Sequence, residues 1–149
     1  MNLIKIAVKV DRNPPKGSVA ADFFFNGPLL FTINHYDLPS LFAGKLHALL
    51  FRKYAKGRDY YDLLFYLRKK TPFNLELFRN AARQTEPALE FNDVPGVLDR
   101  LERTILSMDH KRIRNDIAPF LLDPDELRFV GPEFLSMALR QNIEAGVYR

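Results

Sequence analysis

Residues 38–63, LPSLFAGKLHALLFRKYAKGRDYYDL, decide the fold because they predict two helices separated by a short break. Pro39 suits a helix start, and from Leu41 to Lys53 the apolar side chains recur at the helical spacing. Lys56-Gly57 interrupts this pattern, and a second helix is expected from Arg58 to Lys70. The side chains expected in the core are Phe42, Leu46, Leu49 and Leu50 from the first helix and Tyr60, Leu63, Leu64 and Leu67 from the second.

Upstream of this stretch, the residue pattern changes to that of strands. Apolar and polar residues alternate in residues 2–10, and two further runs rich in strand-forming residues cover 19–25 and 29–36. Tandem prolines within 13–17 and the Asn-Gly-Pro turn at 26–28 separate the three runs. We expect three antiparallel strands that form a thin sheet with an exposed edge.

Downstream, helical patterns continue to the end of the chain. The expected helices run from a cap at Asn74 to about Gln84, and over residues 94–107, 110–121 and 132–145. Strands followed by a bundle of about five to six helices give the α+β class. We expect a single domain, residues 1–149, with a strand region at 1–37 and a helical region at 38–149.

The composition excludes several classes of protein. The chain has 149 residues and no cysteine, which excludes a disulfide scaffold, a thiolate zinc site and a cysteine nucleophile. No apolar run approaches the length of a membrane span, and the segment after Met1 lacks the features of a signal peptide. We therefore expect a cytoplasmic protein without a membrane partner.

The positive charge is concentrated in the middle of the chain. The net charge of the whole sequence is +4, but residues 45–70 alone carry eight basic side chains against Asp59 and Asp62. One interpretation is a solvated helical face, and the other is a binding site for a polyphosphate or an RNA end. The basic side chains are Lys45, Arg52, Lys53, Lys56, Arg58, Arg68, Lys69 and Lys70.

Within this basic stretch, the spacing brings candidate functional side chains together. Lys45 and Arg52 share one stripe of the first helix, so both cations can reach one anion that lies across it. Asp59 and Asp62 share a face of the second helix, and Arg58 and Asp62 have the spacing of an ion pair. The structural alternative is that these residues form surface pairs and that Asp59 stabilises the positive end of the helix dipole.

These residues also carry a resemblance. The pattern K-L-x-A-L-x-x-R at 45–52 followed by R-D-x-x-D at 58–62, with Val10-Asp11-Arg12-Asn13-Pro14-Pro15 upstream, resembles the AbiEii/AbiGii-type nucleotidyltransferase toxin family. The resemblance covers about residues 1–85, and the rest of the chain is similar to the family's helical tail only in a general way. It implies the back half of a polymerase-β-like enzyme that uses a nucleoside triphosphate and Mg²⁺, and a bacterial toxin that works beside an antitoxin in phage defence or plasmid maintenance.

The resemblance also implies roles for individual residues. Lys45 is expected to meet the triphosphate, with Arg52 nearby, and Asp59 is expected to position a base or the acceptor. A lysine and an arginine can neutralise the charge that builds up on the transferred group. The implied catalytic residues are Lys45, Asp59 and Asp62, and the implied nucleotide-binding residues are Lys45, Arg52, Lys56 and Arg58.

The sequence departs from the family pattern at the metal site. The family's Gly-Ser turn followed by an Asp-x-Asp pair does not occur upstream of the helices, and Asp11 is the sole candidate metal ligand. Lys9 stands where the family has an acidic residue, and Asp123-Pro124-Asp125 is interpreted as a capping turn. We therefore expect an enzyme part without its front catalytic half, inactive alone, which is either completed by a separately encoded N-terminal half or is a decayed remnant.

Two other classes of function remain open. One is a non-catalytic module that binds a nucleotide or RNA through the basic cleft, with an exposed tyrosine of the basic stretch as a stacking platform. The other is an interaction protein, such as a homodimer formed through the incomplete sheet.

Overall fold

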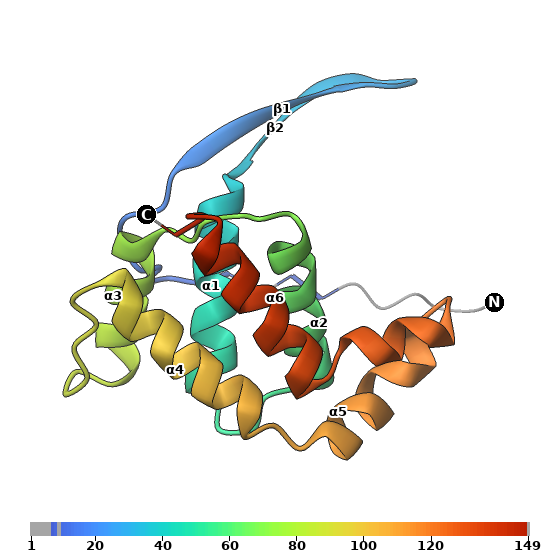
Figure 1. Cartoon of the computed structure of the whole chain (residues 1–149). Helices are drawn as coiled ribbons and strands as arrows, with labels where there is room; N and C mark the ends of the chain where they lie inside the picture. Colours follow the sequence, from blue (N-terminus) through green and yellow to red (C-terminus); the bar gives the residue numbers. More distant parts are fainter. Residues whose placement is uncertain (1–6, 9, 149) are drawn as a thin grey trace.

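A two-stranded hairpin projects from a bundle of helices in the computed structural model, which describes residues 7–8 and 10–148 (Figure 1). Within these residues there are two strands, six α-helices and two short 3-10 helices, so the expected α+β class is confirmed. The elements are β1 (Ala20–Asn26), β2 (Leu30–Tyr36), α1 (Leu38–Phe51), α2 (Gly57–Arg68), α3 (Leu75–Thr85), α4 (Val94–Leu106), α5 (His110–Ile117), η1 (Ala118–Phe120), η2 (Pro124–Phe129) and α6 (Pro132–Glu144).

The sheet has two strands in the described residues, where the sequence predicts three. β1 and β2 pair antiparallel, with Phe23 opposite Ile33 and Phe25 opposite Phe31. The expected strand at 2–10 lies mostly outside the described residues. Its described positions 7, 8 and 10 have no regular structure. The prediction of a half-buried strand is therefore wrong at Val8 and Val10, which are exposed and pair with no strand among the described residues.

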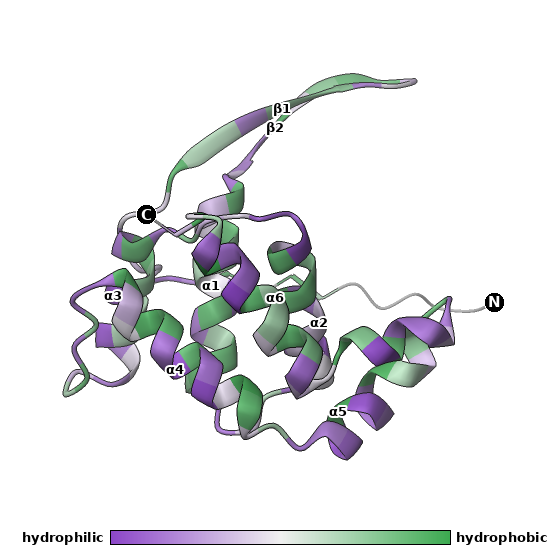
Figure 2. Cartoon of the chain, in the orientation of Figure 1, coloured by the Kyte–Doolittle hydropathy of each residue, from purple (hydrophilic) through white to green (hydrophobic). Residues whose placement is uncertain are grey.

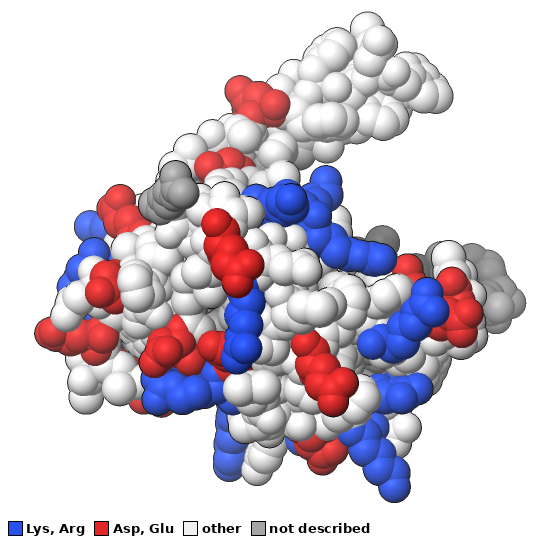
Figure 3. Space-filling model, viewed as in Figure 1, with Lys and Arg blue, Asp and Glu red and all other residues white. Residues whose placement is uncertain are grey.

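The hairpin has one apolar face and one mixed face. Because side chains alternate across a strand, the register places Phe23, Phe25, Phe31 and Ile33 together on one face, which we call the aromatic face. These side chains are between 38% and 52% exposed although they have the pattern of a buried surface. Much of the hairpin is coloured as hydrophobic in Figure 2, with hydrophilic stretches toward its base, and it bears few charged side chains in Figure 3.

A buried hydrogen-bond network fixes the base of the hairpin to the helices. The Ser40 hydroxyl is 1% exposed and accepts hydrogen bonds from the backbone N–H of Val19 and from the Asn74 side chain, at 3.0 and 3.1 Å. Asp37 caps α1 by accepting a hydrogen bond from the Ser40 backbone N–H at 2.9 Å. Asn74 also donates to the Gly17 carbonyl, so the network joins the hairpin to the starts of both α1 and α3.

The helices enclose a single apolar cluster. α1 contacts α2, α3 and α4, while α2 also packs against α5 and α6. The apolar faces predicted for the first two helices are confirmed, since all eight of the predicted core side chains are buried. None of the helices within residues 7–8 and 10–148 is long and apolar enough to cross a membrane.

Two of the predicted helix caps are also confirmed. The Asn74 side chain accepts a hydrogen bond from the Leu77 N–H, and the Asp123 side chain accepts one from the Asp125 N–H. The helix predicted at 110–121 is shorter than expected: α5 ends at Ile117 and a 3-10 turn follows, in which Pro119 has no backbone N–H to donate.

Candidate functional site

Two ion pairs join α1 to α2. Lys45 Nζ lies 2.7 Å from Asp62 Oδ2, and Arg52 Nη1 lies 2.5 Å from Asp59 Oδ2. The structure thus brings together four of the side chains singled out from the sequence. The two cations do not converge on one anion, because each is already bound by its own aspartate.

The two pairs differ in burial. Asp59 is 4% exposed and, besides Arg52, accepts a hydrogen bond from the Lys56 backbone N–H at 2.9 Å. The Lys45–Asp62 pair is solvated, with 48% and 33% of the two side chains exposed. The first pair therefore fixes the end of α1 to the start of α2, whereas the second can exchange with water or a ligand.

The ion pair expected between Arg58 and Asp62 is replaced by another arrangement. Asp62 pairs with Lys45 across the two helices, and Arg58 is one of the residues that line a cavity. Neither Arg58 nor Lys56 forms an ion pair with another described residue.

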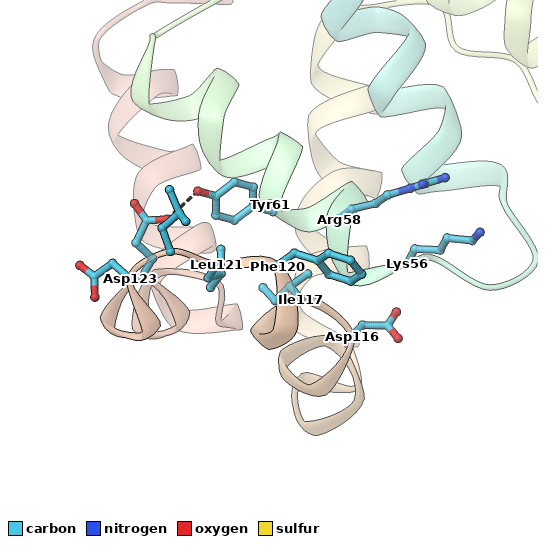
Figure 4. Close-up of a pocket in the computed structure, with 10 residues that line it drawn as sticks. Lys56, Arg58, Tyr61, Asp116, Ile117, Phe120, Leu121 and Asp123 are labelled. Carbon is cyan, nitrogen blue, oxygen red and sulfur yellow. Dashed lines mark hydrogen bonds between the residues drawn. The ribbon is translucent and has the colours of Figure 1, made fainter. Parts of the chain in front are cut away.

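The cavity lies between α2 and the segment that follows α5, and it has a volume of about 650 Å³ (Figure 4). Volumes of this size are typical of sites for small molecules. Its middle is apolar, formed by Ile117, Phe120 and Leu121 together with the ring of Tyr61. In Figure 4, Lys56, Arg58 and Asp116 lie toward one end of the cavity and Asp123 toward the other.

Each acidic group of the cavity accepts a hydrogen bond. The Tyr61 hydroxyl donates to Glu126 Oε2 at 2.6 Å, and this bond, together with burial, raises the pKa of Tyr61. Asp116 accepts from the Gly57 backbone N–H at 3.1 Å, and Asp123 accepts from the Asp125 N–H. The two cations, which have no ion-pair partner among the described residues, are therefore the charges of this cavity most available to a ligand.

Sequence reasoning missed the far wall of this cavity. Residues 116–126 were interpreted as a helix end and a loop, without a role in a site. The sequence signal that could have found them is the apolar run Phe120-Leu121-Leu122. In the structure, Phe120 and Leu122 of this run are exposed and line the cavity.

Asp11 stands apart from the other candidate residues. Its carboxylate is exposed and accepts a hydrogen bond from the Asn13 backbone N–H at 3.0 Å. Within the part of the chain that the structure describes, no group of three or more His, Cys, Asp or Glu side chains could hold a metal ion. The described residues therefore do not fit the two-magnesium centre that the resemblance implies.

The close approach of α2 to α5 at Gly57 shapes the cavity and can be tested. A Cβ atom at Gly57 would lie 2.7 Å from the Ile113 carbonyl oxygen, so we expect Gly57→Ala to lower the free energy of unfolding by about 1–3 kcal/mol. Gly44 in α1 is the matched control, because a Cβ there has no neighbour within 4 Å and alanine favours a helix by up to about 1 kcal/mol. Urea unfolding followed by circular dichroism measures both variants. Equal effects of the two substitutions would contradict the close approach.

One comparison with known proteins gives a match. The family model described as "Nucleotidyl transferase AbiEii toxin, Type IV TA system" matches residues 2–136. The match extends well beyond residue 85, where the sequence patterns placed the end of the specific resemblance, and so includes α4, α5 and the far wall of the cavity. No curated protein and no solved structure matches the chain significantly.

Proposed function

The chain belongs to the AbiEii family of nucleotidyl transferase toxins of type IV toxin–antitoxin systems, and on this premise we propose that it binds a nucleoside triphosphate through Lys45, Lys56 and Arg58. An antitoxin partner is implied by the family. The observation that carries the proposal is the position of Lys56 and Arg58, which line the cavity and form no ion pair with a described residue.

Lys45 and Arg52 take different parts in this proposal. The Lys45–Asp62 pair is exposed, and pairs of this kind contribute about 0–1 kcal/mol, so a triphosphate can displace Asp62 and bind the lysine. Arg52 is held by the buried Asp59 and serves as a positioning residue for the start of α2. Arg58, Tyr61 and Asp62 are neighbours on one face of α2, which joins Lys45 to the cavity.

The test is a calorimetric titration of ATP into the chain at low salt without metal. We expect binding that weakens as salt is added, and a loss of about 10-fold or more in Lys56→Ala/Arg58→Ala, because each charge-assisted contact contributes about 1.5–3 kcal/mol. The matched control is Arg103→Ala, which removes an arginine that is 74% exposed and pairs within α4. An unchanged affinity in the double variant would refute the assignment.

We further propose that the metal-binding carboxylates come from another polypeptide segment, such as a separately encoded N-terminal half, which packs on the aromatic face. That face presents Phe23, Phe25, Phe31 and Ile33 to solvent on a hairpin whose base is fixed by Ser40 and Asn74. Packing on this face would bury the four side chains, and a strand of the same segment could also pair with an outer edge of the two-stranded sheet, which has no strand partner among the described residues.

A transfer assay with a labelled triphosphate tests this second proposal. We expect no transfer by the chain alone and transfer after co-expression with an adjacent open reading frame that carries the missing motif. Lys45→Ala should lower the restored rate by about 100-fold, as loss of a cation that stabilises the transition state does. The alternative function, a nucleotide- or RNA-binding module, is favoured by binding without transfer in either condition, whereas transfer by the isolated chain would exclude the need for a second segment.

A further inference from the structure

The cavity between α2 and the segment that follows α5 has ends of different polarity. At one end, Lys56 and Arg58 outnumber Asp116, whose carboxylate already accepts the Gly57 N–H. At the other end lie Asp123 (Figure 4) and Glu126, which accepts the Tyr61 hydroxyl, and no basic side chain of the described residues lines that end. A ligand that matches the cavity therefore has an anionic group at one end and hydrogen-bond donors at the other.

The middle of the cavity suits a flat, apolar group. Phe120 is 84% exposed, and its ring lines the cavity. Together with Ile117 and Leu121, it lies between the charged side chains of the two ends (Figure 4). The hydrogen bond from Tyr61 to Glu126 holds the second aromatic ring in place. Two aromatic side chains at one small site are typical of platforms on which nucleobases stack.

Glu126 retains an oxygen for a ligand. Its Oε2 accepts the Tyr61 hydroxyl, while Oε1 has no hydrogen-bond partner among the described residues. A carboxylate accepts hydrogen bonds only, so Oε1 favours an N–H donor and repels a carbonyl oxygen placed at the same position. Cytosine carries an amine at position 4 of its ring, where uracil carries a carbonyl oxygen.

We propose that this cavity holds the nucleoside of the bound nucleotide, with the phosphates toward Lys56 and Arg58, and that Glu126 selects bases that carry an exocyclic amine. This inference rests on the proposed function in that it takes the ligand to be a nucleotide. Glu126 acts as a specificity-determining residue, Tyr61 positions it, and Phe120 supports the base.

The experiment compares CTP with UTP by calorimetric titration without metal. Cytosine has an amine at position 4 and an acceptor at N3, where uracil has a carbonyl and an N–H, so CTP is favoured when Glu126 Oε1 faces position 4. We expect CTP to bind at least about 10-fold more tightly than UTP, and Glu126→Gln to bring the ratio close to one, because glutamine offers both a donor and an acceptor. Tyr61→Phe, which frees Glu126 without removing its charge, should lower the ratio partway. The matched control is Glu90→Gln, an exposed carboxylate outside the cavity, which should leave the ratio unchanged.

Equal affinities for CTP and UTP, or a preference that survives Glu126→Gln in a folded variant, would overturn the inference. If Glu126→Gln does not fold, an unchanged ratio in Tyr61→Phe would overturn it instead. Failure of the inference is distinguishable from failure of the proposed function. If CTP and UTP bind equally well and both lose affinity in Lys56→Ala/Arg58→Ala, the base selection is refuted and the proposed phosphate site is supported. Absence of binding by both nucleotides overturns both proposals.

Discussion

Replacing Arg52 with alanine is expected to lower the free energy of unfolding by about 3 kcal/mol. The substitution leaves the carboxylate of Asp59, which is 4% exposed, with the Lys56 N–H as its remaining described donor. Breaking a buried ion pair from one side costs about 3–5 kcal/mol, and the lower end applies because the Arg52 side chain is itself 35% exposed. Urea unfolding at neutral pH, followed by circular dichroism, measures the loss.

Lys45→Ala is the matched control for this prediction. Lys45 also joins α1 to α2 through an aspartate, but its pair with Asp62 is solvated, and we expect a loss of less than about 1 kcal/mol that shrinks further at high salt. If Arg52→Ala and Lys45→Ala lowered the free energy of unfolding equally, the buried ion pair would not be more stabilising than the solvated one, and the prediction would be wrong. The contrast also makes loss of activity interpretable, since the lysine can be removed without weakening the fold.

Phe78→Ala is expected to cost about 3–5 kcal/mol. Phe78 is fully buried, and its ring contacts Phe51, Phe73 and Phe91, with ring centroids 6.2, 6.1 and 5.3 Å away. Alanine removes the group that fills the space between α1, α3 and the connections around them, and the surrounding rings can close that space only in part. The same unfolding measurement reports the effect.

The control for the core prediction is Phe24→Ala in the hairpin. Phe24 is 60% exposed on the mixed face, and its loss should change the stability of the helical part by no more than about 0.5 kcal/mol. A large effect at Phe24, or a small one at Phe78, would mean that the cooperative core is not the cluster described.

The helical part of the fold could be predicted because its signals are local. Helical spacing placed Leu46 and Leu63 in the core, and capping chemistry placed Asn74 at the start of α3. The strand predicted through Val8 and Val10 is wrong there because alternation shows only that a residue suits a strand. Whether a strand forms depends on a neighbour to pair with, which the pattern does not contain.

The candidate site could be predicted only in part, for a related reason. The spacing placed Lys45, Arg52, Asp59 and Asp62 near one another, but the ion pairs depend on how α1 crosses α2, which the sequence does not display. The cavity depends on a contact between Gly57 and Asp116, 59 positions apart in the sequence. Long-range packing of this kind also places the hydrogen-bond-accepting carboxylate of Glu126 at one end of the cavity. No sequence motif predicts that position.

The hairpin also determines how the isolated protein behaves at high concentration. Both strands are seven residues long, contain no proline and carry Asp22 as their one formal charge. Such segments with open edges are the units from which cross-β aggregates grow. Because the hairpin lies outside the apolar core, a core substitution can raise the free energy of unfolding in urea without making the protein more soluble. We therefore expect the solubility of the isolated chain to depend mainly on these 14 residues, and a single lysine on the aromatic face to improve it more than a core substitution does.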